Sequence, residues 1–412
     1  MGFFYSVFIY LYLFLIRIVS LGNSKARLWL DGRKNLLARV EQATAGMKNP
    51  VWMHCASLGE FEQGRPLLEA LKAANPNQAI VLSFYSPSGY EIRKDYAFAD
   101  YVCYLPLDTI SNSRRFLDIL NPSAVYIVKY EFWFNLLEEI RTRNIPAYLV
   151  SGVFRKDQIF FRWYGSWFIE KLRAFKRFYV QDQTSAVLLA GLGFSNTLVS
   201  GDTRFDRVLE IAAQYAENKT VKEFAGDKKV IIAGSSWEPD EAILAALTWK
   251  EAGYKLIITP HETEQEHIAA VLNLFEGKGN IVLYSRAGSA DLKAADILIV
   301  DAIGLLSVIY RYGTLAMIGG GFGEGIHNIL EPAVMGLPVI FGPDHEKFQE
   351  ASELIALGGA FCIHSAEEMQ TLFSRLNDNP ELLKKASETA REYVKGKSGA
   401  VDKIMKDLRI MI

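Results

Sequence analysis

A carboxylate stands where an apolar strand gives way to a helix in VWMHCASLGEFEQG, residues 51–64. Val51–Cys55 predicts a buried strand, the small residues after it predict a turn, and Glu60 falls where the next helix should begin. An acid at this place can cap the helix or interact with its dipole, which contributes about 0.3–1 kcal/mol. If Ser57 caps the helix instead, Glu60 is left available for chemistry on a ligand.

A second acid, Glu131, also follows a predicted strand, in YIVKYEFWFN at residues 126–135. Its aromatic neighbours lower the local polarity, which raises the pKa of a carboxyl group toward neutrality. Strand ends of one parallel sheet lie at one edge, so both acids could face the same ligand. The alternative is an ion pair of Glu131 with Lys129 or Arg155.

Arg204 stands in GDTRFDRV, residues 201–208, at the expected end of a first domain. A guanidinium group is permanently charged and binds carboxylate or phosphate through two parallel hydrogen bonds. Arg204 is therefore a candidate for contact with an anionic ligand. A surface arginine in an interdomain hinge is the alternative.

Glycines crowd the segment IGGGFGEGIHNILEPAVMGLPVIFGP, residues 318–343, directly after a predicted strand. Such a loop exposes backbone N–H groups and a helix N-terminus, which suits a phosphate. Glu331 in the following helix could hold ribose hydroxyls, and no GK[ST] follows, so this is not a Walker loop. An ordinary turn between core elements is the alternative. The phosphate-loop candidates are Gly320, Gly321, Gly323 and Gly325, with Ser235 and Ser236 of GSSWEPDE.

Short apolar runs alternate with amphipathic stretches along the rest of the chain, and this alternation restarts after a polar segment near residues 206–229. The pattern predicts an α/β protein with two doubly wound parallel sheets, whose ligands bind beyond the carboxyl ends of the strands. We expect a first domain at residues 25–210 and a second domain at residues 211–412, whose last helix could pack back on the first. Pro260 and His261 follow a strand of the second domain, although His261 could simply neighbour a helix cap.

The N-terminal stretch from Phe3 to Leu21 is almost wholly apolar, with Arg17 as its one charge, and basic residues follow it. This predicts a membrane anchor at residues 1–24 that spans or lies on the bilayer, with the body on the cytoplasmic face. A buried N-terminal helix is the alternative.

Composition excludes some classes of protein. The net charge of −2 argues against a nucleic-acid binder. The three cysteines are far apart and the six histidines form no HExxH pattern, so we expect neither a disulfide framework nor a metal site.

The ordered set of motifs resembles one family, the 3-deoxy-D-manno-octulosonic acid (Kdo) transferases of lipopolysaccharide assembly. The resemblance covers nearly the whole chain and is carried by HCASLGEFE, YEFWFN, GDTRFD, GSSWEPDE, GLLSVIY and the glycine-rich segment. It implies a GT-B fold of two Rossmann-like domains facing a cleft. It also implies inverting, metal-independent transfer of Kdo from CMP-Kdo to a lipid A precursor at the inner membrane, with no cofactor.

The resemblance further implies residue roles. Glu60 is the expected general base, and Glu131 and Arg204 are expected to stabilise charge. The implied CMP contacts are Pro260, His261, Ile303, Gly304, Leu305, Asn328, Ile329, Leu330 and Glu331. Two rival functions are a GT-B transferase that uses a UDP-sugar and a catalytically inactive membrane-bound scaffold.

Overall fold

The structure, a computed structural model, describes residues 2–214 and 217–411. The chain divides into two compact units, here called unit 1 (Met1–Arg207 with Ser398–Ile412) and unit 2 (Val208–Lys397). Each unit holds one seven-stranded sheet in which every pairing is parallel. The predicted α/β class with two doubly wound sheets is confirmed.

The sheet of unit 1 has the strand order β3-β2-β1-β4-β5-β6-β7. Its strands are β1 (Val51–Cys55), β2 (Ile80–Phe84), β3 (Tyr101–Tyr104), β4 (Ala124–Val128), β5 (Ala147–Gly152), β6 (Phe175–Val180) and β7 (Thr197–Val199). One face is covered by α3 (Leu36–Thr44), α6 (Ile110–Leu120), α7 (Phe134–Thr142), α8 (Ser166–Leu172) and α9 (Gln183–Gly191). The other face is covered by α4 (Leu58–Ala74) and α19 (Ala400–Met411). Burial from both sides explains why the strands are almost continuously apolar.

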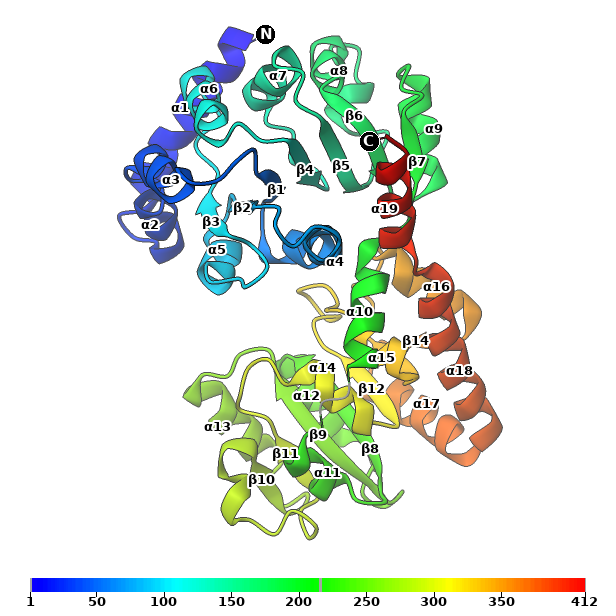
Figure 1. Ribbon diagram of the computed structural model, residues 1–412. Helices are drawn as coiled ribbons and strands as arrows, with labels where there is room; N and C mark the ends of the chain where they lie inside the picture. Colours follow the sequence, from blue (N-terminus) through cyan, green and yellow to red (C-terminus); the bar gives the residue numbers. More distant parts are fainter. Residues whose placement is uncertain (1, 215–216, 412) are drawn as a thin grey trace. The chain divides into compact units, whose positions relative to one another are not determined.

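The remaining elements of unit 1 are α1 (Gly2–Val19), α2 (Ser24–Asp31), α5 (Pro87–Arg93), the short 3-10 helix η1 (Ile159–Phe161) and the start of α10 (Thr203–Ala213). The C-terminal helix α19 is fastened to this unit by two polar groups. Arg177 Nη2 donates to Asp407 Oδ1 at 2.8 Å, and the Asp206 carboxylate accepts the N–H of Gly399 at 2.8 Å. The last helix of the chain therefore packs on unit 1, beside β7 in Figure 1.

The sheet of unit 2 has the order β10-β11-β9-β8-β12-β13-β14. Its strands are β8 (Lys229–Ser236), β9 (Tyr254–Pro260), β10 (Ile281–Leu283), β11 (Ile297–Ile299), β12 (Leu315–Ile318), β13 (Val339–Phe341) and β14 (Ala360–Cys362). One face packs against α12 (Glu238–Ala246), α13 (Gln265–Leu274) and α17 (Ala366–Asp378). The other helices are α11 (Lys219–Ala225), η2 (Tyr284–Ser289), α14 (Leu306–Ile309), η3 (Tyr310–Tyr312), α15 (Leu330–Met335), α16 (Gln349–Leu357) and α18 (Pro380–Lys397).

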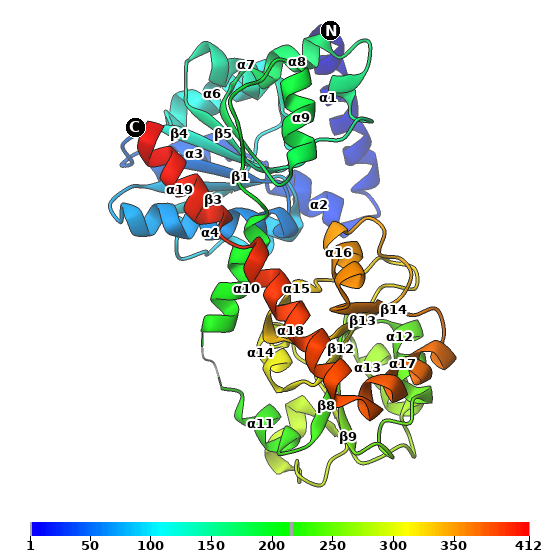
Figure 2. The ribbon, with the colours of Figure 1, turned by 90° about the vertical axis from the view of Figure 1, so that its right-hand side faces the viewer.

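Helix α1 lies along the outside of unit 1 (Figures 1 and 2) and keeps a mostly apolar surface exposed. Its inner side packs Ile9 against Trp29 and Leu107. Its outer side exposes Phe4, Val7, Phe8, Tyr10, Leu11, Phe14, Leu15, Ile18 and Val19. No helix in the described part of the chain combines the length and the apolar character needed to cross a membrane.

Asp108 joins α1 to the body of unit 1. Its buried carboxylate accepts the Tyr5 hydroxyl at 2.6 Å, the Ser113 hydroxyl at 2.9 Å, and the backbone N–H groups of Asn135 and Leu136 at 3.0 and 2.9 Å. The last two lie in the first turn of α7, so one acid caps that helix and holds α1.

Asp108→Ala is expected to lower the free energy of unfolding by about 3 kcal/mol, because it leaves several buried donors without an acceptor. Denaturant unfolding followed by tryptophan fluorescence measures the loss. Asp118→Ala is the control, since Asp118 is 67% exposed in its ion pair with Arg143 and should cost less than about 0.5 kcal/mol. Equal stability of the two variants would contradict this role of Asp108.

Candidate active site

Glu60 lies in the first turn of α4, just after the carboxyl end of β1, an interior strand of its sheet. Figure 1 shows β1 and α4 in unit 1. Ser57 is the N-cap, and its hydroxyl accepts the N–H of Glu60 at 3.4 Å. The Glu60 carboxylate also accepts the N–H of Ala56, through Oε2 at 2.5 Å. Ser57 is therefore the residue that caps the helix, and Glu60 accepts a hydrogen bond from the turn before it. Among residues 2–214 and 217–411, Glu60 has no ion-pair partner.

The electrostatic surroundings of Glu60 favour proton uptake. Burial first, and the negative charge of Glu131 second, raise the pKa of Glu60 to about 7. The N–H groups of Ala56 and Ser57 and the charge of Lys129 act in the opposite direction. A carboxyl group with this pKa can accept a proton at neutral pH and is a stronger base than an exposed glutamate.

Glu131 lies in the loop between β4 and α7. Its Oε2 accepts the indole N–H of Trp133 at 2.7 Å and lies 3.5 Å from Nε2 of His54. Lys129, just after β4, has a φ of 61°, an uncommon value for a non-glycine residue. Lys129 and Tyr130 form a turn directly after β4, and Glu131 follows this turn.

Arg204 is fixed in the first turn of α10 and is not an isolated cation. Its Nε and backbone N–H both donate to the buried Asp202 carboxylate, at 2.8 and 2.9 Å. The adjacent Thr203 hydroxyl donates to the backbone carbonyl of Gln63 in α4, the helix that carries Glu60. Unit 1 therefore holds Arg204 against the Glu60 helix.

Tyr130 links the predicted residues of unit 1 electrostatically. Burial is the main cause that raises the pKa of its phenol, to which the charge of Glu60 adds and which the charge of Arg204 opposes. Both charges therefore act on one side chain. The structure gathers Glu60, Glu131 and Arg204 around the carboxyl edge of one sheet.

In unit 2, the side-chain rings of three residues stack on one another near the ends of strands. His261 stacks on Trp237 with ring centroids 4.6 Å apart, and on His327 at 4.5 Å. The indole N–H of Trp237 donates to Nε2 of His327 at 3.1 Å. Burial, and then the neighbouring His261, lower the pKa of His327 to about 4, so its imidazole is neutral and can accept this hydrogen bond at neutral pH.

The glycine-rich loop after β12 is tied to neighbouring groups. Gly320 N–H donates to Asp240 Oδ2 at 3.0 Å, and the Ser236 hydroxyl donates to Glu241 at 2.9 Å. Gly320, Gly323 and Gly325 all have positive φ, which side-chain-bearing residues rarely adopt. Gly321 packs directly on the backbone of Gly342, where a Cβ atom would clash. Ser235 lies at the end of β8 with a φ of 51°.

The other predicted CMP contacts lie in three segments of unit 2. Asn328 lies just before α15 and binds its first turn, since its Oδ1 accepts the N–H of Leu330 at 3.0 Å and its Nδ2 donates to Glu331 at 3.0 Å. Ile329 and Leu330 are buried, and Pro260 ends β9. Ile303 is 88% exposed, Gly304 has a φ of 84° and Leu305 is the N-cap residue of α14. Among the described residues, no cluster of His, Cys, Asp or Glu could hold a metal ion.

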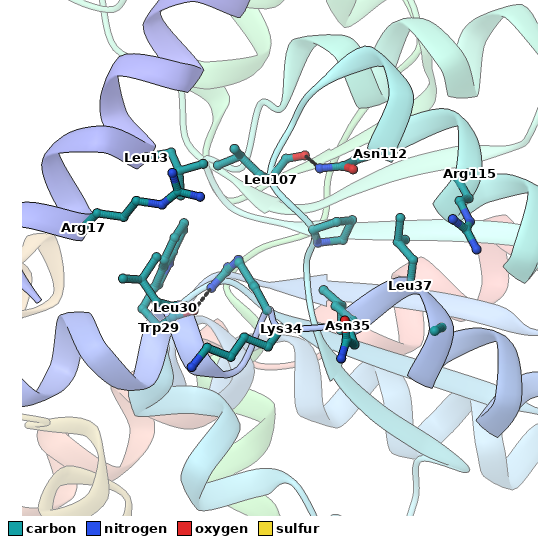
Figure 3. A pocket seen from close by; sticks show the side chains of 14 residues that line it. Leu13, Arg17, Trp29, Leu30, Lys34, Asn35, Leu37, Leu107, Asn112 and Arg115 are labelled. Atoms are coloured by element: carbon teal, nitrogen blue, oxygen red, sulfur yellow. Dashed lines mark hydrogen bonds between the residues drawn. The ribbon is translucent and has the colours of Figure 1, made fainter.

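A pocket of about 610 Å³ opens between α1, α2, α3 and α6 (Figure 3). Its cationic lining residues are Arg17, Arg33, Lys34 and Arg115, with no acidic side chain among its described lining residues, and Leu13, Trp29, Leu30, Leu36, Leu37, Pro106 and Leu107 supply apolar walls. In Figure 3 the Arg17 side chain extends from α1 into this space. Lys34 and Arg115 also make exposed ion pairs with Asp31 and Glu41.

An aromatic series connects this pocket to Glu131. Trp29 in the pocket wall contacts Tyr85 at 5.6 Å, and Tyr85 contacts Trp133 at 4.5 Å between ring centroids. Trp133 is the indole that donates to Glu131. The pocket and the carboxylate pair therefore share one packed aromatic wall within unit 1.

Comparison with known proteins identifies the family. A family model described as 3-Deoxy-D-manno-octulosonic-acid transferase (kdotransferase) matches residues 32–207. A 3-deoxy-D-manno-octulosonic acid transferase of Aquifex aeolicus is 30% identical over 345 residues, which cover 82% of this chain and 88% of the relative. The chain belongs to the Kdo transferase family. A further Kdo transferase, from Bordetella pertussis, is 27% identical and aligns with 89% of this chain and 88% of its own length.

Family membership makes this protein a glycosyltransferase. The solved UDP-GlcNAc 2-epimerase from Neisseria meningitidis bound to UDP-GlcNAc is similar with a TM-score of 0.61 at 15% identity, over 87% of this chain and 99% of that one. At this identity the likeness concerns the fold alone, and it confirms the predicted GT-B class.

Sequence reasoning gave no role to several groups at these sites, His54, Asp202, Trp237, Asp240 and His327, although His327 beside the glycines did favour a ligand there. Asp202 is adjacent to Thr203 and Arg204 in the GDTRFD motif, so its place there was a usable signal. No sequence pattern pointed to His54, because a single histidine in an apolar strand is typical of a core residue.

Proposed function

We propose that this Kdo transferase moves Kdo from CMP-Kdo to a hydroxyl of a lipid A precursor such as lipid IVA. The transfer proceeds with inversion and needs neither a metal ion nor another cofactor. The observation that carries the proposal is the Glu60 carboxyl group, half-buried beside Glu131, with a pKa of about 7 and no ion-pair partner among the described residues. That is the state a general base for an alcohol acceptor needs.

The proposed mechanism follows from the needs of the two substrates. Glu60 takes the proton of the acceptor hydroxyl as the oxygen attacks the anomeric carbon, and the bond from that carbon to the CMP phosphate oxygen breaks. The phosphate leaves as a stable anion and needs little protonation, so one base suffices. Arg204 would attract the carboxylate of Kdo, while Glu131 would stabilise positive charge that develops at the sugar ring. Attack opposite to the leaving phosphate inverts the anomeric centre.

We assign the donor to unit 2. The CMP contacts implied by the family are its residues Pro260, His261, Ile303–Leu305 and Asn328–Glu331, and the glycine loop is the candidate for the phosphate. The flat surface of the Trp237, His261 and His327 stack is suited to a planar base or ring. The acceptor is assigned to unit 1, which carries Glu60.

Purified protein incubated with CMP-Kdo and lipid IVA tests the proposal, with mass spectrometry to detect added Kdo. Calorimetry with CMP and UDP addresses the rival donor. A product containing Kdo and a clear preference for CMP support the proposal. A UDP preference, or an inactive protein that still binds CMP, would point to the other transferase or to the scaffold.

We also propose that α1 lies on the cytoplasmic face of the inner membrane and brings the enzyme to its lipid acceptor. The supporting observations are the exposed apolar side of α1 and the cationic pocket beside it. An amphipathic helix held flat on a domain by its inner side can insert its outer side into the headgroup region. The pocket would take an anionic headgroup.

Phe8→Asp combined with Leu11→Asp is expected to weaken vesicle binding on the order of tenfold or more, because two exposed apolar side chains of α1 become charged. Co-sedimentation with vesicles of zwitterionic and of mixed anionic lipids measures it. Arg17→Glu should reduce mainly the preference for anionic vesicles. Val187→Asp, an exposed position on α9 at the other side of unit 1 in Figure 1, is the control. Equal binding by all variants would exclude α1 as the attachment.

A further inference from the structure

A chain of polar side chains runs through the core beneath Glu131. His54 on β1 and Ser83 on β2 are direct partners in the parallel register, and both are fully buried. Nδ1 of His54 lies 2.8 Å from the Ser83 hydroxyl and 3.1 Å from the Ser83 carbonyl. The indole N–H of Trp52 donates to the same hydroxyl at 2.8 Å. Buried polar groups of this kind need partners, and here the chain ends at Glu131.

The hydrogen-bond partners of His54 and Ser83 determine which nitrogen of the imidazole ring carries the hydrogen. The Trp52 N–H can only donate, so the Ser83 hydroxyl oxygen accepts it, and the hydroxyl hydrogen is then available to Nδ1 of His54. With Nδ1 accepting, the ring proton is on Nε2. That atom is buried and has no partner at hydrogen-bonding distance in the described residues, but the nearest acceptor is Oε2 of Glu131 at 3.5 Å.

The alternative tautomer is less favourable at this place. A proton on Nδ1 would bind the Ser83 carbonyl and leave a lone pair on Nε2 facing a carboxylate. An imidazolium ring would again present an N–H to Glu131. Every arrangement that avoids the clash of lone pair and anion therefore places a hydrogen on Nε2.

We propose that His54 is a positioning residue of the transferase, whose Nε2–H holds the Glu131 carboxylate in place beside Glu60. The proposal rests on the proposed function of Glu60 and Glu131. His54 reaches neither substrate, because its side chain is fully buried in the sheet. The second anchor of Glu131, Trp133, comes from its own loop, so His54 is the described contact that ties this carboxylate to the sheet.

Other charged and titratable groups act on the same two acids. Glu131 acts electrostatically on Tyr85 and Cys55, and Glu60 interacts with Lys129, Tyr130 and Cys55. None of these groups donates a hydrogen bond to Glu131 from within the sheet. Substitution of His54 therefore removes one defined donor while these charges stay in place.

The test is a double-mutant cycle of His54→Leu and Glu131→Gln, read out as kcat and KM of Kdo transfer from CMP-Kdo to lipid IVA. His54→Leu is expected to lower kcat about tenfold with KM for CMP-Kdo unchanged, since the N–H group that faces the Glu131 carboxylate from 3.5 Å is lost. In the Glu131→Gln background the same change should have no further effect, because His54 acts through that carboxylate. His54→Gln, which keeps an N–H near the Nε2 position, should recover most of the rate.

Ser83→Ala gives a second variant that changes little volume. It removes the hydroxyl that donates to Nδ1, which favours the tautomer with a lone pair toward Glu131, so it should lower kcat in the same direction. Met53→Leu, on the opposite face of β1, is the matched core control. Thermal unfolding of each variant identifies losses caused by unfolding.

Equal and additive losses from His54→Leu in both backgrounds, or no rescue by glutamine, would overturn the proposal, as would wild-type kcat in both His54→Leu and Ser83→Ala. The proposed function is judged separately by the activity of the wild-type protein and of Glu60→Gln. If the wild-type protein transfers Kdo and Glu60→Gln abolishes this transfer, the proposed function holds whether or not substitution of His54 lowers the rate.

Discussion

Glu60→Gln is expected to lower the rate of Kdo transfer by about 10²–10⁴-fold, because glutamine keeps the size of the side chain and cannot accept the acceptor proton. The Ala56 N–H that binds Glu60 keeps an acceptor in the glutamine amide oxygen, so the turn before α4 stays formed. CMP affinity should remain close to that of the wild type, since the assigned donor residues lie in unit 2. Transfer rates and calorimetry with CMP measure the two quantities.

Two controls separate loss of the base from loss of the fold. Glu62→Gln changes an acid in the same helix that pairs with Arg93 at 2.9 Å, and it should leave the rate within a few-fold. The second control is the thermal stability of Glu60→Gln compared with that of the wild type. The pKa of Glu60 is raised on folding to about 7, so its stabilising contribution is complete at low pH and is lost as pH rises through about 7. At pH 8, Glu60→Gln should therefore be at least as stable as the wild type. An active Glu60→Gln enzyme would remove the base assignment.

The second large effect is the dependence of the rate on pH. A base must be deprotonated to act, so kcat/KM should fall with decreasing pH below the Glu60 pKa of about 7. A single group with that pKa predicts a loss of about a hundredfold between pH 8 and pH 5. The phosphodiester of CMP-Kdo does not change its charge between pH 5 and pH 8, so the pH dependence of kcat/KM reports on groups of the enzyme.

The variant Glu131→Gln tests whether Glu60 is the group that determines the pH dependence of kcat/KM. The negative charge of Glu131 is the second cause that raises the pKa of Glu60, so its removal should move the acidic limb of kcat/KM to lower pH. Rates measured from pH 5 to pH 9 for both proteins give the two midpoints. Glu69→Gln is the control, because Glu69 is occupied by Arg65 at 2.7 Å and should leave the midpoint in place. A flat profile, or a midpoint moving upward in Glu131→Gln, would contradict the assignment.

The order of elements could be predicted from the sequence because local patterns determine it. Apolar runs such as Val51–Cys55 and Leu315–Ile318 are bounded by turn residues and need burial on both faces, which only a covered parallel sheet supplies. The edge strands β7 and β14 were not predicted. Each has three residues and pairs on one side only, which leaves a short apolar run as the one local signal; β10 is an edge strand of the same length, and its run Ile281–Leu283 was predicted.

The strand-end positions of Glu60 and Glu131 were also readable, since an acid at a strand–helix junction is a local feature. Their roles, with that of Arg204, stay predictions. What these side chains contact was not readable. Arg204 binds Asp202, and Glu131 binds Trp133 and faces His54 rather than Lys129 or Arg155.

Local residue patterns were enough to predict the alternation of strands and helices, the motif set that identifies the family, and an acid at the carboxyl end of β1. The contact of Ser83 and His54 beneath Glu131 became visible only in the folded chain, as did the packing that links α1 and Trp29 to Glu131 through Tyr85 and Trp133. This difference arises because a strand or a cap depends on neighbours in the chain. A pKa near 7 or a buried hydrogen-bond chain depends on groups brought together by packing, and no local pattern records which of them will meet.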